Sequence, residues 1–197
     1  MKNKSLWLLA TSLGVLCVWM AFGYYDSSKL RSIIGIQPGA LVLSQSALPV
    51  LHWGDLNRFG DLGLKIKTKT FVNLAEAVLE QTVRYNELTY TQVQAGLFLT
   101  ILNGERVFIL TDPFTPESLN PTVALEFTSD WTVLQRSSLL PENWPEPSQG
   151  WIVLGSQISE GLKTKSLETQ KPVLRPESAG TVWLEKTPES DWFVTKP

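Results

Sequence analysis

The sequence holds few side chains that could carry out covalent chemistry. His52 is its only histidine and Cys17 its only cysteine. A Ser-His-Asp triad would have to use His52, and a lone histidine is more often structural than catalytic. A serine activated by a lysine amine needs no histidine, so this pair is the remaining route to nucleophilic catalysis.

The same scarcity argues against bound metals and cofactors. The sequence has no cluster of His, Cys or carboxylate residues with metal-site spacing, and no glycine-rich loop of the kind that cradles phosphates. The formal net charge is −2, without the basic excess of a nucleic-acid-binding protein. We therefore expect no metal, no cofactor and no nucleic-acid partner.

One short segment combines two serines with a distinctive pattern. Residues 44–55 read Ser-Gln-Ser-Ala-Leu-Pro-Val-Leu-His-Trp-Gly-Asp. They resemble the nucleophile box of type I signal peptidases, Ser-x-Ser-Met-x-Pro-Thr-Leu-x-x-Gly-Asp, which lies soon after an N-terminal membrane helix. Later segments are similar to that family in the same order: a hairpin at 96–109, a Gly-Trp-Ile-Val-Leu-Gly run at 150–155 and the segment 176–183.

The resemblance implies a β-rich peptidase fold with its catalytic face near the membrane surface. It implies that Ser46 is the nucleophile and that the Ser44 hydroxyl helps to stabilise the oxyanion. It also implies that Pro49 and Thr89 lie on the substrate-binding side. In the family, a buried lysine takes the proton of the serine, and its position falls near Thr89 in this chain.

The sequence departs from the family at this base. No lysine lies between Lys69 and Lys163, so the position near Thr89 has no amine. Lys65, Lys67 and Lys69 alternate with Leu64, Ile66 and Thr68, which predicts a half-buried strand whose lysine face points to solvent. An amine in solvent is a poor base at neutral pH. We therefore predict a signal-peptidase-like protein that binds an exported polypeptide without cleaving it.

An uncharged N-terminal run predicts a membrane anchor. Residues 6–25 carry no charge, and at about 1.5 Å per residue they span a bilayer core of about 30 Å. Lys2 and Lys4 precede the run, which favours a cytoplasmic N-terminus and an exported remainder. We expect a single-pass protein of the cytoplasmic (inner) membrane that contacts lipid through this helix. A cleaved signal peptide is the alternative, because Ala21-Phe22-Gly23 offers small residues for processing.

The rest of the sequence predicts one mainly β domain of antiparallel strands with a single helix. We expect residues 1–25 to form the cytoplasmic start and anchor, 26–38 a juxtamembrane linker and 39–197 the extracytoplasmic domain. Periodicity and turn residues predict strands at 40–43, 62–70, 123–127 and 151–154, a helix at 74–85 capped by Asn73, hairpins at 97–111 and 181–195, and a loop at 140–150.

Three functions fit these observations. The first is a non-catalytic, signal-peptidase-like protein that binds or positions exported polypeptides, or assists assembly of a secretion or pilus-type complex. The second is an active serine leader peptidase whose base is Lys65, Lys67 or Lys69. The third is an unrelated bitopic subunit that interacts with other subunits of an envelope complex.

Overall fold

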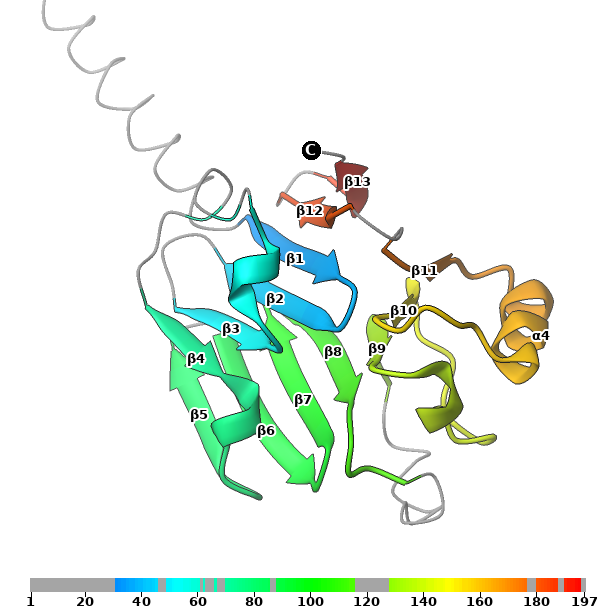
Figure 1. Ribbon diagram of the computed structural model, residues 1–197, viewed down its shortest axis with the longest axis horizontal. Coiled ribbons are helices and arrows are strands. Elements are labelled where there is room, and N and C mark those ends of the chain that lie inside the picture. The colour runs from blue at the N-terminus through cyan, green and yellow to red at the C-terminus, as the bar shows by residue number, and fades with distance from the viewer. Residues whose placement is uncertain are drawn as a thin grey trace, which may run out of the picture.

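The computed structural model describes residues 31–45, 49–60, 62, 66, 70–85, 88–115, 128–176, 180–187 and 190–195. Over these residues the chain is mainly β, as predicted, with two mixed sheets and one α-helix (Figure 1). In this part of the chain, no helix is both long and apolar enough to cross a membrane. The predicted anchor at 6–25 and the predicted strand at 123–127 lie outside the described residues.

The first sheet has six strands in the order β13-β12-β1-β2-β3-β4. Neighbouring strands of this sheet pair antiparallel, except for β3 and β4, which pair parallel. The predicted strand at 40–43 is confirmed as part of β2, and the predicted hairpin at 181–195 is confirmed as β12 and β13. The strands are β1 (Ser32–Gln37), β2 (Ala40–Gln45), β3 (Val50–Trp53), β4 (Phe71–Asn73), β12 (Val182–Lys186) and β13 (Phe193–Thr195).

The second sheet has seven strands in the order β11-β10-β9-β8-β7-β6-β5. Strands β5 to β8 are antiparallel, as expected, but β8 to β11 are all parallel, so the predicted antiparallel arrangement holds only in part. The strands are β5 (Thr82–Tyr85), β6 (Leu88–Gln94), β7 (Leu97–Leu102), β8 (Glu105–Leu110), β9 (Trp131–Leu134), β10 (Gly150–Val153) and β11 (Val173–Leu174).

Two predicted elements of this sheet are confirmed. Strands β7 and β8 form the expected hairpin, and Asn103 and Gly104 at its turn have φ angles of 53° and 80°. A two-residue turn with positive φ at both positions matches the twist of the flanking strands. The buried strand expected at 151–154 is β10, and the helix α4 (Glu160–Thr169) connects it to β11.

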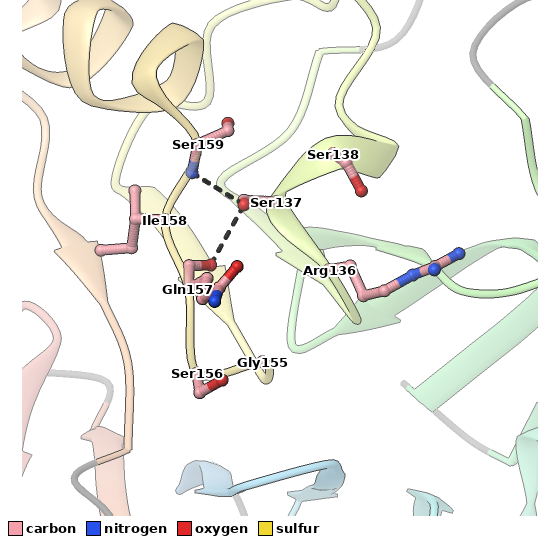
Figure 2. Close-up of a pocket in the computed structure, with 8 residues that line it drawn as sticks. All are labelled: Arg136, Ser137, Ser138, Gly155, Ser156, Gln157, Ile158 and Ser159. Carbon is pink, nitrogen blue, oxygen red and sulfur yellow. Dashed lines mark hydrogen bonds between the residues drawn. The ribbon is translucent and has the colours of Figure 1, made fainter.

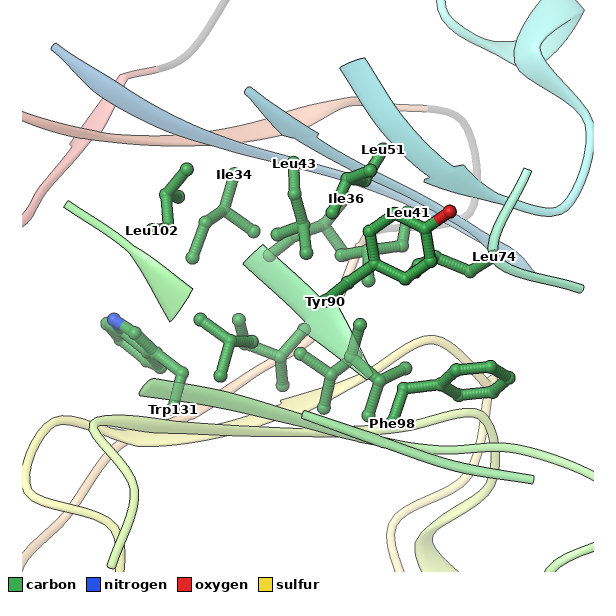
Figure 3. Packing of buried hydrophobic residues seen from close by; sticks show 14 of the residues in the cluster. Ile34, Ile36, Leu41, Leu43, Leu51, Leu74, Tyr90, Phe98, Leu102 and Trp131 are labelled. Carbon is green, nitrogen blue, oxygen red and sulfur yellow. The ribbon is translucent and has the colours of Figure 1, made fainter. Parts of the chain in front are cut away.

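The main core lies between the two sheets and is built by strand alternation (Figure 3). Every second residue of a strand faces the core, and the residues between them face outward. On the first sheet the inward residues include Ile34, Leu43 and Leu51, whereas Ile33 and Val42 belong to a second cluster on its outer side. The second sheet contributes Leu88, Tyr90, Phe98, Leu102, Val107, Ile109, Trp131, Val133, Ile152 and Leu154 to the same core.

The predicted helix at 74–85 is wrong. Asn73 does act as a cap, because its side chain accepts a hydrogen bond from the Ala75 amide at 3.1 Å. The capped element is a single 3₁₀ turn, η2 (Leu74–Glu76), and residues 82–85 form β5. Val83 and Tyr85 pack against the core while Thr82 and Arg84 are exposed, so pairing with β6 at a period of two prevails over the helical pattern.

Two further expectations about the first sheet need correction. Residues 32–37, placed in the linker at 26–38, form the fully buried strand β1 between β2 and β12. The strand expected at 62–70 does not begin at Leu62, which is helical, and the Ile66 amide donates to the Leu62 carbonyl at 2.8 Å. Lys65, Lys67 and Lys69 lie outside the described residues.

Candidate functional site

Of the two serines in the predicted nucleophile box, the structure describes only Ser44. Ser46 lies outside the described residues. Ser44 is on β2, where it is 1% exposed and its Oγ has no hydrogen-bond partner. It pairs with Ile33 across the strands and shares a face with Val42, and both belong to the outer cluster of the first sheet. Its side chain therefore points away from the second sheet.

Thr89, the position that corresponds to the family lysine, points in the opposite direction. Its neighbours Leu88 and Tyr90 on β6 face the core between the sheets, so the Thr89 side chain lies on the outer face of the second sheet. The whole core separates Thr89 from Ser44. Pro49 is half-buried and immediately precedes β3 in the first sheet, whereas Thr89 is on β6 in the second sheet.

A different set of polar residues gathers at the other end of the sandwich. The parallel strands β8 to β11 share one direction, so their carboxyl ends lie together. The turn between β1 and β2 lies at the same end, because the Gly39 amide donates to the Leu154 carbonyl at 2.9 Å. Since β2 starts at Ala40 and ends at Gln45, Ser44 lies at the opposite end. In open α/β sheets, ligands usually bind beyond the carboxyl ends of the parallel strands.

A pocket of about 350 Å³ opens at this end, between the segments that follow β9 and β10 (Figure 2). One wall is formed by residues 136–138 and the other by residues 155–159. Apart from Ile158, the lining consists of serines, a glutamine, a glycine and an arginine. The pocket therefore offers several hydrogen-bonding groups to a ligand.

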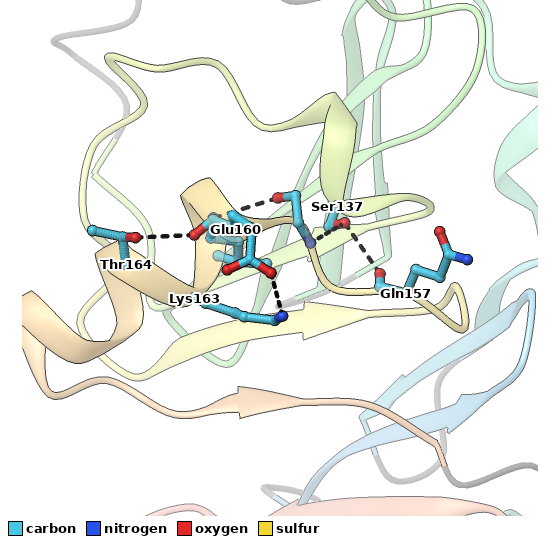
Figure 4. Close-up of polar contacts among 7 residues, drawn as sticks. Ser137, Gln157, Glu160, Lys163 and Thr164 are labelled. Carbon is cyan, nitrogen blue, oxygen red and sulfur yellow. Dashed lines mark hydrogen bonds and ion pairs between the residues drawn. The ribbon is translucent and has the colours of Figure 1, made fainter.

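Ser137 holds the two walls together. Its Oγ donates to the Gln157 carbonyl at 3.1 Å and accepts from the Ser159 amide at 2.8 Å (Figures 2 and 4). The Ser159 hydroxyl is also occupied, because it caps α4 by accepting a hydrogen bond from the Leu162 amide at 3.4 Å. Ser137 and Ser159 thus build the pocket, while Ser138, Ser156 and Gln157 are exposed at its surface.

The charges around the pocket are paired at the surface. Arg136 forms an ion pair with Asp112, and their side chains are 58% and 49% exposed. Such a pair contributes little to stability, so a ligand can compete for the guanidinium. Arg175 donates to the Ser156 carbonyl at 3.1 Å and supports the second wall.

The pocket has the groups for recognition but lacks those for covalent catalysis. Both partners of the Ser137 hydroxyl are backbone groups, so no base activates it. Within the described residues no group of three His, Cys, Asp or Glu residues could hold a metal ion. His52 is half-buried, with Nδ1 3.3 Å from the Gly54 carbonyl oxygen, which is consistent with the structural role predicted for it.

The environment of Lys165 on α4 perturbs its amine. Burial lowers the pKa of Lys165, and the nearby carboxylates of Glu142 and Glu168 oppose the shift. Its amine donates to the carbonyl groups of Pro141 and Glu142. Lys165 therefore fastens α4 to the loop before β10, and it is not one of the residues that line the pocket.

The pocket residues had no motif by which they could be found. Serine, glycine and glutamine after a strand read as ordinary loop residues, and only the buried strand at 151–154 followed by Gly155-Ser156 marked a strand end. A scan against protein-family models finds no match to the chain, and a search of curated proteins finds none either. The site must therefore be interpreted from its own geometry.

Proposed function

We propose that this chain is a non-catalytic binding protein that holds a short part of an exported polypeptide in the pocket between residues 136–138 and 155–159. One observation supports this most directly: the pocket lies at the carboxyl ends of parallel strands, and the Ser137 hydroxyl that joins its two walls has only backbone partners. The likeness to signal peptidases and the membrane anchor stay predictions from the sequence.

The lining of the pocket offers hydrogen-bonding groups that match a peptide backbone. The hydroxyl groups of Ser138 and Ser156 and the amide of Gln157 can donate to peptide carbonyls and accept from peptide amides. A volume of about 350 Å³ is near the lower end of the range for ligand pockets, about 300–1,000 Å³. The pocket would therefore hold about one or two residues rather than a long segment.

The test uses the full chain in lipid nanodiscs and a fluorescein-labelled peptide with the small-x-small sequence of exported precursors. We expect saturable binding by fluorescence polarisation and an intact peptide after prolonged incubation. In Ser156→Tyr the phenol ring occupies the pocket, so binding weakens severalfold. Leu167→Tyr is the matched control, because Leu167 is 80% exposed on α4 and does not line the pocket.

Two results would contradict the proposal. If the wild type cleaves the peptide and Ser46→Ala does not, the chain is an active leader peptidase. Equal affinity in wild type, Ser156→Tyr and Leu167→Tyr, or no saturable binding at all, would remove the pocket as the binding site and favour the unrelated envelope subunit.

A further inference from the structure

The edge strand β13 presents two apolar side chains to the surroundings. Phe193 is 42% exposed and Val194 is 51% exposed, on the outermost strand of the first sheet. Successive strand residues face opposite sides, so the two side chains flank the edge of the sheet. Proteins usually protect an edge strand with charge or cover, because exposed apolar edges favour association.

This edge lies beside the point where the chain enters the domain. Phe193 pairs with Glu185 on β12, and Glu185 pairs with Ile33 on β1, so the three residues form one row across the sheet. Figure 1 shows β12 and β13 next to β1. With strands about 4.8 Å apart, Phe193 lies about 10 Å from Ile33 and at the same level along the strands.

The predicted anchor limits how far this row can lie from a membrane. The uncharged run ends at Tyr25, and Ile33 follows eight positions later. A fully extended chain covers at most about 3.6 Å per residue, which gives about 29 Å, and any bend shortens the distance. Strand β1 then runs away from this point toward the turn at Gly39.

Among the described residues near the row, the charged side chains do not form a basic patch. Arg31 pairs with the buried Glu185, and Lys186 pairs with Glu105. Asp191 is an exposed acid next to β13. These described residues therefore offer little attraction to anionic headgroups, and their contact with lipid would depend on apolar surface.

We propose that Phe193 and Val194 rest in the interface of the membrane to which residues 6–25 anchor the chain. The inference depends on the predicted anchor and not on what the pocket binds. Lipid is the partner of this edge strand, because a short tether to a membrane keeps β13 close to a bilayer. The pocket, at the other end of the strands, then faces the aqueous phase.

The test places a fluorescent label on the full chain in phosphatidylcholine vesicles. Cys17→Ser removes the native thiol, and Val194→Cys or Leu167→Cys then carries an environment-sensitive nitrobenzoxadiazole group. Leu167 is the control because it is 80% exposed on α4. Lipids with a nitroxide near the headgroup should quench the label at 194 severalfold more than the label at 167, equally at low and high salt.

Several outcomes would overturn the proposal. Equal quenching at the two positions, or free access of aqueous iodide to the label at 194, would show that this edge does not touch lipid. Quenching that disappears at high salt would mean electrostatic attraction instead of apolar contact. A chain that stays in solution when the vesicles are pelleted would remove the anchor, and peptide binding to the pocket would be unaffected by that result.

Discussion

Two buried serines are expected to respond to the same substitution with opposite signs. The Ser44 hydroxyl is 1% exposed and has no partner, so Ser44→Ala removes a buried polar group that gains nothing from the fold. Burying an unbonded hydroxyl costs about 1–3 kcal/mol by mutational measures. Ser44→Ala deletes one atom and leaves only a small void, so we expect the free energy of unfolding to rise by about 0.5–2 kcal/mol.

Ser137→Ala should be destabilising instead. Its Oγ makes two hydrogen bonds, to the Gln157 carbonyl and from the Ser159 amide, in a largely buried position. Each such bond contributes about 0.5–1.5 kcal/mol net, so we expect a loss of about 1–3 kcal/mol. For a domain of this size, a change of 1 kcal/mol corresponds to about 2–4 °C in Tm.

The assay is urea unfolding of both variants followed by tryptophan fluorescence, with thermal melts as a second measure. Ser138→Ala is the control, because this exposed neighbour of Ser137 should change stability by less than about 0.5 kcal/mol. Peptide binding should weaken in Ser137→Ala, which loosens the pocket walls, and stay unchanged in Ser44→Ala. Destabilisation by Ser44→Ala, together with loss of peptide binding or cleavage, would refute this reasoning and favour the oxyanion role.

Three other substitutions test the packing and the electrostatics. Gly35→Ala should cost about 1–3 kcal/mol in urea unfolding, since a Cβ there would lie 2.4 Å from a ring carbon of the buried Trp183; full stability would contradict this close contact. Gly161→Ala should stabilise by about 0.5–1 kcal/mol, because it lies in α4 with open space around its Cβ position, and a loss of stability would show a contact there. The lowered pKa of Lys165 means that the unfolded chain binds more protons than the folded one between the folded pKa and the ordinary value of 10.5. Stability should therefore rise with pH in that alkaline window, and Lys165→Met should reduce the rise; identical slopes in pH-dependent urea unfolding would refute it.

The elements that were predictable are those whose signals are local. The Asn103-Gly104 turn has the positive φ angles that its sequence demands, and the apolar run at 151–154 forms a buried strand. Strand β1 was not predicted, because all of Ser32–Gln37 is buried and a strand buried on both faces lacks the alternation of a half-buried strand. Helix α4 was not predicted, because only Leu162 of its ten residues is buried and the helix therefore has no apolar stripe.

The candidate site was less predictable than the fold, because it depends on strand direction. An antiparallel arrangement would alternate the strand ends, whereas the parallel run from β8 to β11 brings them all to one end. Parallel neighbours require crossover connections, and the crossover through α4 carries little apolar periodicity. The resemblance at 44–55 predicted a site at the opposite end, where Ser44 and Thr89 lie on the outer faces of different sheets.

The direction of β1 links the two proposals. This strand starts at Ser32, a few residues after the predicted anchor, and ends at Gln37 next to the turn that contacts Leu154. The four residue steps from Ile33 to Gln37 cover about 13 Å, so the pocket end of β1 lies about that much farther from the chain entry than the row at Ile33. A ligand of the pocket would therefore approach from the aqueous side, whereas a signal-peptidase site would have to meet its substrate at the membrane surface. Because the two functions need opposite ends of the same sandwich, locating peptide contacts near Ser156 or near Ser44 distinguishes between them.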